Sequence, residues 1–384
     1  ETSLETGLSA ISKIPNSSIY LFGEVSALVS ARNTSDIYSS ASDAFVDFER
    51  LYAGFLIPEL GKNKGISLLA SYGRNFYQLN DGFLISRYSG SANAGHRAGV
   101  YTSPRTTFQK NAQLKLNWKN WSVAGTFLEP EELYKDKQLN TNYFVGSLDY
   151  RNKQSFDLGI YYIQVLGGKA VYNTLSGTLA KKGMYIINPK LWIHSIAGTS
   201  FFFKTEFAKQ LHLDEDMKAY AWYMGAGYRF EDLRTRPSLY YRYAFMQGDK
   251  PETETYERFD PMLTGGLGNW VQGLNFRKVV GNGNIISHRL EASAWINSHL
   301  ILSLDYHYLR ADQLNNIGAV SAISQLKDKN LGQEFTLSLK GPVIDHLTLL
   351  TTVSYAIPGK ALKASFDENL SDWFTAQVSL FINF

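Results

Sequence analysis

The feature that most constrains the fold is an alternation of apolar and polar residues in segments of about ten residues, separated by short breaks. "RLEASAWINSHLILSLDYHYL" (Arg289–Leu309) contains two such segments on either side of Asn297 and Ser298. Successive side chains of a strand point to opposite faces, so each segment places apolar residues on one face and polar residues on the other. The stretch therefore predicts a β-hairpin with one apolar and one polar face.

The same alternation recurs along most of the chain. Its apolar positions include Leu21 and Val25, Phe144 and Leu148, Leu158 and Ile160, Trp222 and Met224, Phe335 and Leu337, and every second residue from Phe374 to Phe384. We expect about 18 strands, within a range of roughly 16 to 20, and no helix. We expect residues 1–384 to form one barrel domain, with residues 1–17 as an N-terminal periplasmic segment.

The distribution of large apolar residues favours a membrane barrel over a soluble β protein. The chain has no apolar run long enough for a helical span. Aromatic residues make up 14% of it, and Tyr and Trp often stand at strand ends, where interfacial girdles need them. An open sheet cannot cross a bilayer, because its edges would leave backbone groups unpaired. The sequence predicts an all-β, antiparallel, up-and-down barrel in the bacterial outer membrane, with a soluble all-β protein as the alternative.

The connections alternate in length, as they do between the two ends of an outer-membrane barrel. Short breaks are expected near residues 119–120, 152–153, 182–183, 297–298 and 341–342, and long ones at about residues 31–43, 75–94, 129–141, 248–268 and 310–330. We expect the last strand to pair with the strand near Ile19–Val29, with Phe374 to Phe384 facing lipid and Thr375, Gln377, Ser379 and Asn383 facing the lumen. We also expect that an export signal has been removed and that Glu1 begins the mature chain.

Composition excludes several other functions. The 38 basic and 35 acidic residues give a net charge of +3, too balanced to indicate nucleic-acid binding. The chain has no Cys, and its 7 His have no ligand spacing, so we expect no metal site and no cofactor. It has no GxSxG motif or local pairing that would single out a nucleophile, so we expect no enzyme activity.

A channel needs a constriction and lining charges. The alternation places six basic side chains in the lumen, namely Arg151, Lys204, Arg229, Arg242, Arg289 and Lys340. Arginine can hold a carboxylate with two hydrogen bonds and exchange it along a series of similar sites. Alternatively, these cations pair with lumen carboxylates such as Asp149, Asp157, Glu206, Asp305 and Glu334, and Arg289 and Glu291 stand two apart on one face.

Four segments and the chain's ending resemble the alginate-export family of outer-membrane barrels. They are "LASYGRNFYQLNDGFLI" (Leu69–Ile85), "YERFDPMLTG" (Tyr256–Gly265), "HRLEASAWINSHLILSLDYHYLRADQLNN" (His288–Asn316), "NLGQEFTLSLK" (Asn330–Lys340) and the closing "YAIPGKAL…WFTAQVSLFINF". The resemblance implies a monomeric barrel of about 18 strands that passes an anionic exopolysaccharide outward. It does not fix the polymer, so transport of another glycan or uptake of a small solute stays open.

The stretch 249–270 is the best candidate for a loop with a role of its own, because it begins acidic and ends rich in Gly. Its RFDP sequence matches the family's pattern. If this loop folds into the lumen, Arg258 and Asp260 stand at the constriction; if it stays outside, it packs on its neighbours.

Three functions remain after these steps. The first is a channel for an anionic, alginate-like polysaccharide with an arginine-lined lumen. The second is a general or sugar-selective diffusion porin, and the third is an adhesin-like barrel whose loops bind outside partners. The expected partners are a polysaccharide or oligosaccharide, outer-membrane lipid and lipopolysaccharide, and periplasmic export proteins.

Overall fold

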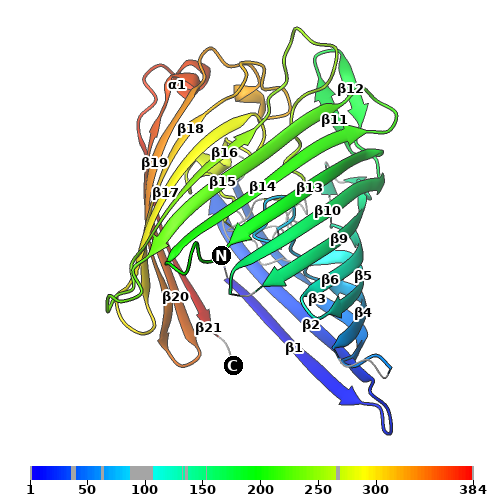
Figure 1. The fold of residues 1–384 in the computed structure, drawn as a ribbon. Coiled ribbons are helices and arrows are strands. Elements are labelled where there is room, and N and C mark those ends of the chain that lie inside the picture. Colours follow the sequence, from blue (N-terminus) through cyan, green and yellow to red (C-terminus); the bar gives the residue numbers. More distant parts are fainter. Residues whose placement is uncertain are drawn as a thin grey trace.

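The computed structural model describes residues 2–35, 40–61, 65–86, 107–131, 133–134, 137–152, 154–264 and 269–382. Within them, 17 strands form one antiparallel sheet that curves into a barrel wall (Figure 1). They are β1 (Thr2–Lys13), β2 (Tyr20–Ser35), β3 (Ser40–Ile57), β4 (Ile66–Asn75), β5 (Phe108–Trp118), β6 (Trp121–Glu129), β9 (Asn142–Asn152), β10 (Phe156–Gly167), β13 (Met184–Ile193), β14 (Phe201–His212), β15 (Lys218–Arg229), β16 (Ser238–Met246), β17 (Ile285–Trp295), β18 (Ile301–Arg310), β19 (Asn330–Ile344), β20 (Leu347–Pro358) and β21 (Trp373–Ile382). The all-β, up-and-down prediction is confirmed.

The predicted alternation sets which side chains face outward. On β21, Phe374, Val378 and Leu380 are 60–68% exposed, while the buried polar residues of the neighbouring strands face the interior. A soluble domain buries its apolar side chains and exposes its polar ones, whereas this barrel has apolar side chains outside and polar ones inside. Such an outer face is suited to contact with the acyl chains of a membrane. Asn383 and Phe384, the last residues of the predicted closing strand, lie outside the described residues.

The connections between strands differ at the two ends of the barrel, with short turns at one end and longer segments at the other (Figure 1). The long end contains two small hairpins, β7 (Leu133–Tyr134) with β8 (Lys137–Gln138) and β11 (Val171–Thr174) with β12 (Gly177–Ala180), and also the helix α1 (Lys360–Phe366). The helix was not expected from the alternation. We take the long end as external.

Two predicted connections are wrong, and the short turn predicted near residues 341–342 lies instead at Asp345 and His346, because Gly341 and Pro342 pair within β19. Residues 31–43 do not form a long loop, because β2 and β3 pair with each other as far as Ser35 and Ser40. Residues 182–183 are not a short turn but the end of the connection from 168 to 183, which contains β11 and β12. Residues 87–94 of the predicted loop 75–94 lie outside the described residues.

The N-terminal segment belongs to the sheet. We expect residues 1–17 to form an N-terminal periplasmic segment, but Thr2–Lys13 form β1, which pairs along its whole length with β2. β2 has β1 on one edge and β3 on the other, so β21 cannot pair with it, and the predicted closure against Ile19–Val29 is wrong. Within the described residues, β21 pairs only with β20.

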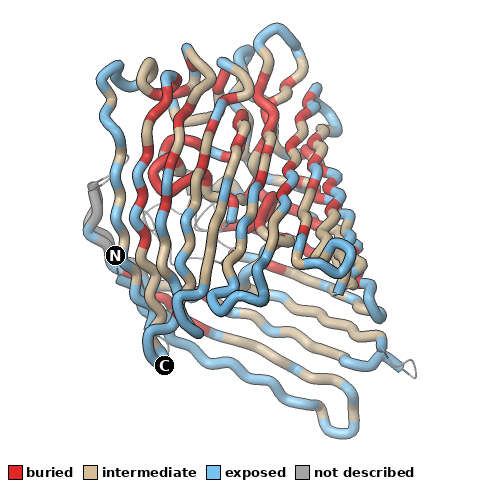
Figure 2. The backbone as a smooth tube through the Cα atoms, turned by 60° about the vertical axis from the view of Figure 1, so that its left-hand side comes forward, coloured by how far each residue is buried: buried red, intermediate tan, exposed pale blue. Residues whose placement is uncertain are grey.

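The buried residues gather inside the external half of the barrel, where connecting segments turn into the lumen (Figure 2). The core cluster combines inward side chains of the strands with loop residues, among them Phe83, Phe259, Trp270 and Phe276. Because these loop residues pack inside the barrel, they position the candidate site.

Among the described residues, no helix is long and apolar enough to cross a membrane.

Candidate pore and constriction

Strand register brings several predicted lumen residues onto one lateral row. Direct pairing across neighbouring strands runs Arg151, Asp157, Trp192, Lys204, Gly225, Arg242, Arg289, His307, Glu334. Because residues paired in register point to the same face, these side chains lie along one lateral row of the inner wall. The consecutive members Arg242, Arg289 and His307 on β16, β17 and β18 are called the basic row below.

Within the basic row, Arg289 has acidic partners. Its Nη2 lies 2.6 Å from Oδ1 of Asp305 and 2.8 Å from Oε2 of Glu291. Its Nε also donates to Asp305 at 2.7 Å. Arg289 therefore pairs with one carboxylate of its own strand, Glu291, and with one of the next strand, Asp305. The spacing of Arg289 and Glu291 in the sequence allows the first of these ion pairs.

Arg242 and His307 differ from Arg289. The side chain of Arg242 donates one hydrogen bond, from Nη1 to the carbonyl of Asn269 at 3.0 Å, and its guanidinium lies 4.0 Å from the centre of the Trp270 ring. Within the described residues its Nε and Nη2 have no hydrogen-bond partner, and neither ring nitrogen of His307 has one. Both residues are buried, at 2% and 4% exposure. Buried polar groups are usually satisfied, so these orphan atoms mark a candidate binding position.

Two loop segments meet in the lumen beside the basic row, residues 76–86 and 269–284, which we call the plug. Phe83 packs against Trp270 at 4.7 Å and against Tyr223 of the wall at 5.2 Å between ring centres. Asp81 accepts hydrogen bonds from Nε1 of Trp270 at 3.0 Å and from the hydroxyl of Tyr223 at 3.3 Å. These contacts attach the two segments to each other and to Tyr223 of β15.

The plug is anchored on the far side by Glu334 of β19. This buried carboxylate accepts backbone N–H groups from Leu274, Asn275 and Phe276, and the hydroxyls of Ser354 and Thr336. The side chain of Asn275 donates to Ser354 of β20 at 3.0 Å. Successive N–H groups around a carboxylate form charge-assisted hydrogen bonds, so Glu334 fastens the plug instead of neutralising a lumen cation.

The adjoining part of the inner wall carries a mixed cluster, Asp149 on β9, Lys190 on β13 and Glu206 on β14, which we call the acidic wall. Lys190 Nζ lies 3.2 Å from Oδ1 of Asp149, and Glu206 accepts the hydroxyl of Tyr223 at 3.1 Å. Register places Lys190 directly beside Glu206. Two carboxylates share one cation here, and the sequence identified the carboxylates as lumen residues without identifying Lys190.

Arg258 and Asp260 are held within the packed external loops. Arg258 donates to Oδ1 of Asn316 at 2.6 Å and to the carbonyl of Gly283 at 3.3 Å. Burial lowers the pKa of Arg258. Asp260 lies 2.7 Å from Lys181 Nζ and accepts the hydroxyl of Tyr172 at 2.7 Å. Burial would raise the pKa of Asp260, but the charge and hydrogen bond of Lys181 and the Tyr172 hydroxyl outweigh it and leave the pKa below its ordinary value.

The remaining predicted cations are not gathered at the plug. Lys204 lies over the Trp192 ring at 4.8 Å and Arg229 over the Phe202 ring at 4.4 Å. Arg229 stands at the short-turn end of β15, and Lys340 is exposed near the short-turn end of β19. Arg151 is exposed at the other end of the lateral row.

Sequence reasoning missed the two residues that organise the plug, Asp81 and Trp270. Both lie in loops, where the strand alternation gives no direction for a side chain. The only signal available was their place in aromatic-rich loops, "NFYQLNDGFLI" and "GNW". The described residues also contain no group of three or more His, Asp or Glu that could hold a metal ion.

Comparisons with known proteins agree with this architecture. No curated protein matches the chain in sequence. Among solved structures, OccK5 (OpdH) of Pseudomonas aeruginosa is similar with a TM-score of 0.57 at 11% identity, covering 100% of this chain and 92% of that chain. OccAB2 of Acinetobacter baumannii gives 0.57 at 11% identity over 99% and 91% of the two chains. The outer membrane protein OprD of Pseudomonas aeruginosa gives 0.52 at 12% identity over 99% and 91%.

At these identities the likeness concerns the fold alone. The family evidence is independent of it, because the model of the family described as "Alginate export" matches residues 30–375, nearly the whole chain. The chain belongs to the alginate export family of bacterial outer-membrane channels.

Proposed function

We propose that this channel passes an anionic polysaccharide, with the basic row guiding carboxylate groups through the lumen. The observation that carries the proposal is the state of Arg242 and His307, which are buried and keep polar nitrogen atoms without partners. A carboxylate offers acceptors to a guanidinium in the geometry that two N–H donors need. Arg289 beside them is already neutralised by Asp305 and Glu291, so it does not become a deep binding site.

The plug gives the proposed channel a closed state. Trp270 lies over Arg242, and the carbonyl of Asn269 takes one of its donors, so the plug occupies the position where a carboxylate would bind. A polymer can reach the basic row once residues 269–276 leave it. A polymer that enters from the periplasm also requires an export partner there, and one barrel is sufficient for passage, so we propose that the protein works as a monomer.

Planar-bilayer recording tests the proposal. We expect the current to prefer anions, and oligo-uronates to block it at lower concentrations than neutral oligosaccharides of the same length. In Arg242→Met the anion preference should fall about two- to fivefold, as expected for the loss of roughly 0.5–1 kcal/mol of charge interaction near water. Lys340→Met, which removes an exposed cation far from the plug, is the matched control. Equal block by charged and neutral sugars would contradict the proposal.

A specific observation supports the second candidate, a diffusion porin for small solutes. The acidic wall places Asp149 and Glu206 on the stretch of inner wall that adjoins the basic row, with Lys190 as their shared cation. Neighbouring regions of opposite charge orient small dipolar solutes and hinder a polyanion. Uptake of neutral or zwitterionic solutes into vesicles, without block by oligo-uronates, would favour this function.

A further inference from the structure

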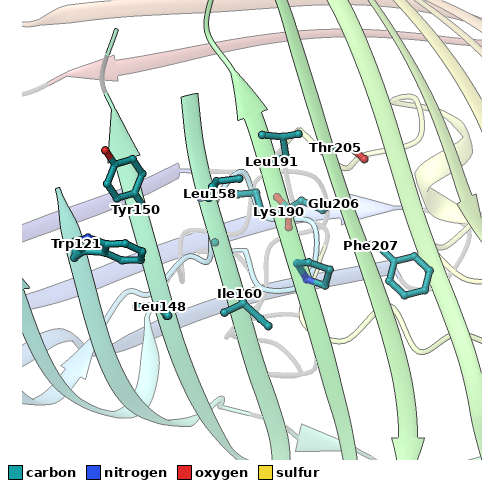
Figure 3. A pocket seen from close by; sticks show the side chains of 12 residues that line it. Trp121, Leu148, Tyr150, Leu158, Ile160, Lys190, Leu191, Thr205, Glu206 and Phe207 are labelled. Carbon is teal, nitrogen blue, oxygen red and sulfur yellow. The ribbon is translucent and has the colours of Figure 1, made fainter. Parts of the chain in front are cut away.

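The outer surface of the barrel has a groove where the sheet is locally interrupted. It has a volume of about 480 Å³ and is lined by apolar residues of β6, β9, β10, β13 and β14 (Figure 3), including Trp121, Leu148, Leu158, Ile160, Leu191 and Phe207. These side chains stand on the outward, lipid-facing positions of their strands. The groove is therefore a recess in the membrane-facing wall, and its lining also includes Lys190 and Glu206 of the acidic wall.

Pro189 explains why the groove forms there. Proline cannot donate to a strand ladder and is rare in central strands. The pairing of β13 with β14 runs Ile187 to Lys209 and resumes at Lys190 to Glu206, so the ladder skips Asn188 and Pro189. The side chain of Asn188 replaces the missing donor by bonding to the carbonyl of Phe207 at 2.9 Å. The Asn188 side chain therefore connects β13 and β14 where the backbone pairing is missing. The gap in the ladder remains open on the lipid side.

Two lysines stand directly above the groove at the external end of the same face. Lys209 follows Phe207 on the outward side of β14, and Lys218 begins β15, where register pairs it with Leu211. They are thus diagonal neighbours on one face, about 7–8 Å apart between backbones. Neither forms an ion pair with a described residue, although Lys209 lies 5.5 Å from the centre of the Tyr220 ring.

The charge of Glu257, in the external connection between β16 and β17, acts on Lys209, and this carboxylate also lies 3.7 Å from Nζ of Lys250. The other outward positions of β13 to β16 are uncharged, for example Tyr185, Ile187 and Tyr243. A long lysine side chain reaches from such a position to the level of the lipid head groups. Two unpaired cations at the external rim therefore attract an anionic head group of the outer leaflet.

We propose that this surface binds lipid A, the phosphorylated glucosamine lipid of lipopolysaccharide. A phosphate lies between Lys209 and Lys218, and one acyl chain follows the outward face from Phe207 into the groove beside Pro189. The external position of the lysines selects the outer leaflet, where lipopolysaccharide resides. The groove below them favours a ligand that has acyl chains. A free phosphate can contact the two lysines but cannot fill the groove.

Native mass spectrometry of the full chain in detergent tests the head group. With bis-phosphorylated lipid A as the probe, Lys209→Gln combined with Lys218→Gln should retain roughly 25-fold less lipid, from about fivefold per lysine near an anionic surface. Arg310→Gln, which removes a cation at the external end of β18, is the matched control and should change retention less than twofold. Dephosphorylated lipid A should bind the unmodified protein as weakly as intact lipid A binds the double variant.

The groove is tested with both lysines in place. Ile160→Trp fills the recess and should weaken lipid A retention about fivefold, whereas Leu239→Trp, on the lipid face of β16 outside the groove, should not. Heat-modified migration on gels verifies that each variant is a folded barrel. Unchanged retention in the double lysine variant, or equal retention of phosphatidylglycerol and lipid A by the unmodified protein, would overturn the proposal.

Discussion

The two walls of the lumen treat their buried charges differently. On the acidic wall, Lys190 lies between Asp149 and Glu206, and each charge has an opposite charge or a hydroxyl donor beside it. On the basic row, Arg289 is paired but Arg242 and His307 keep orphan nitrogen atoms. Buried charges that have protein partners are part of the structure of the wall, whereas buried donors without partners are available to bind a solute. We therefore treat the acidic wall as structural and propose the basic row as the part of the lumen that binds a solute.

The largest expected effect tests the acidic wall. Lys190→Met leaves Asp149 and Glu206 buried without their cation, and removing one partner of a buried pair costs about 3–5 kcal/mol. The free energy of unfolding, measured by urea titration with tryptophan fluorescence, should fall by that amount. Lys204→Met removes a lumen lysine that lies on Trp192 without an ion pair and serves as the control. Equal losses in the two variants would remove the distinction between the walls.

The anchor of the plug should give the next largest effect. Glu334→Ala leaves the buried N–H groups of residues 274–276 without their acceptor, at a cost of about 1–3 kcal/mol. The plug should also leave the basic row more often, so single-channel recordings should show a higher open probability. Glu291→Ala is the control, because Arg289 keeps Asp305 as a partner. An unchanged open probability would mean that Glu334 supports the wall alone.

A smaller effect is expected for the basic row. Arg242→Met removes two nitrogen atoms without a described partner and one hydrogen bond, to the carbonyl of Asn269, so the gain from losing the unsatisfied donors offsets the loss of that bond. The free energy of unfolding should change by less than about 1 kcal/mol. Arg289→Met should cost more, because Asp305 and Glu291 then lose their shared partner. If Arg242→Met destabilises as strongly as Lys190→Met, Arg242 is a structural residue.

The smallest effect concerns acid and the external loops, beyond both walls. The folded-state pKa of Asp260 is lowered from the ordinary value of 3.8, since Lys181 and Tyr172 outweigh the effect of burial. Its stabilisation is thus present above pH 3.8 and is lost as the pH falls through the lower folded value. Hydrogen exchange in residues 256–264 should accelerate in that acid range. Asp260→Asn should exchange faster at neutral pH and lose the acid-dependent step.

The sequence predicted most of the wall and little of the plug, for a physical reason. A strand fixes side-chain direction by its period of two, so Arg242, Arg289 and Glu291 could be placed in the lumen without a structure. The direction of a loop side chain depends on contacts that are distant in sequence, such as Asp81 with Trp270. Glu334 shows what the strand alternation can and cannot predict. The alternation predicts that its side chain points inward, but it does not predict that the side chain accepts backbone N–H groups of residues 274–276.

Two further differences come from the ends of elements. The alternation near the N-terminus was too weak to reveal β1, which is exposed along its described length and shares only one edge with the sheet. The connection at residues 36–39 looked long because "SARNTSDIYSSASD" is polar, although most of it continues the β2–β3 ladder. Polar composition indicates a solvent-facing strand extension as readily as a loop.

The position of Glu334 also has a consequence for the order of folding. The plug segment 274–276 follows β16 in the chain, but its acceptors come from β19 and β20, and Thr375 of β21 adds a hydrogen bond to Asn275 at 2.5 Å. The plug can therefore reach its place in the lumen only after β19, β20 and β21 have joined the wall, so its docking reports the assembly of these three strands.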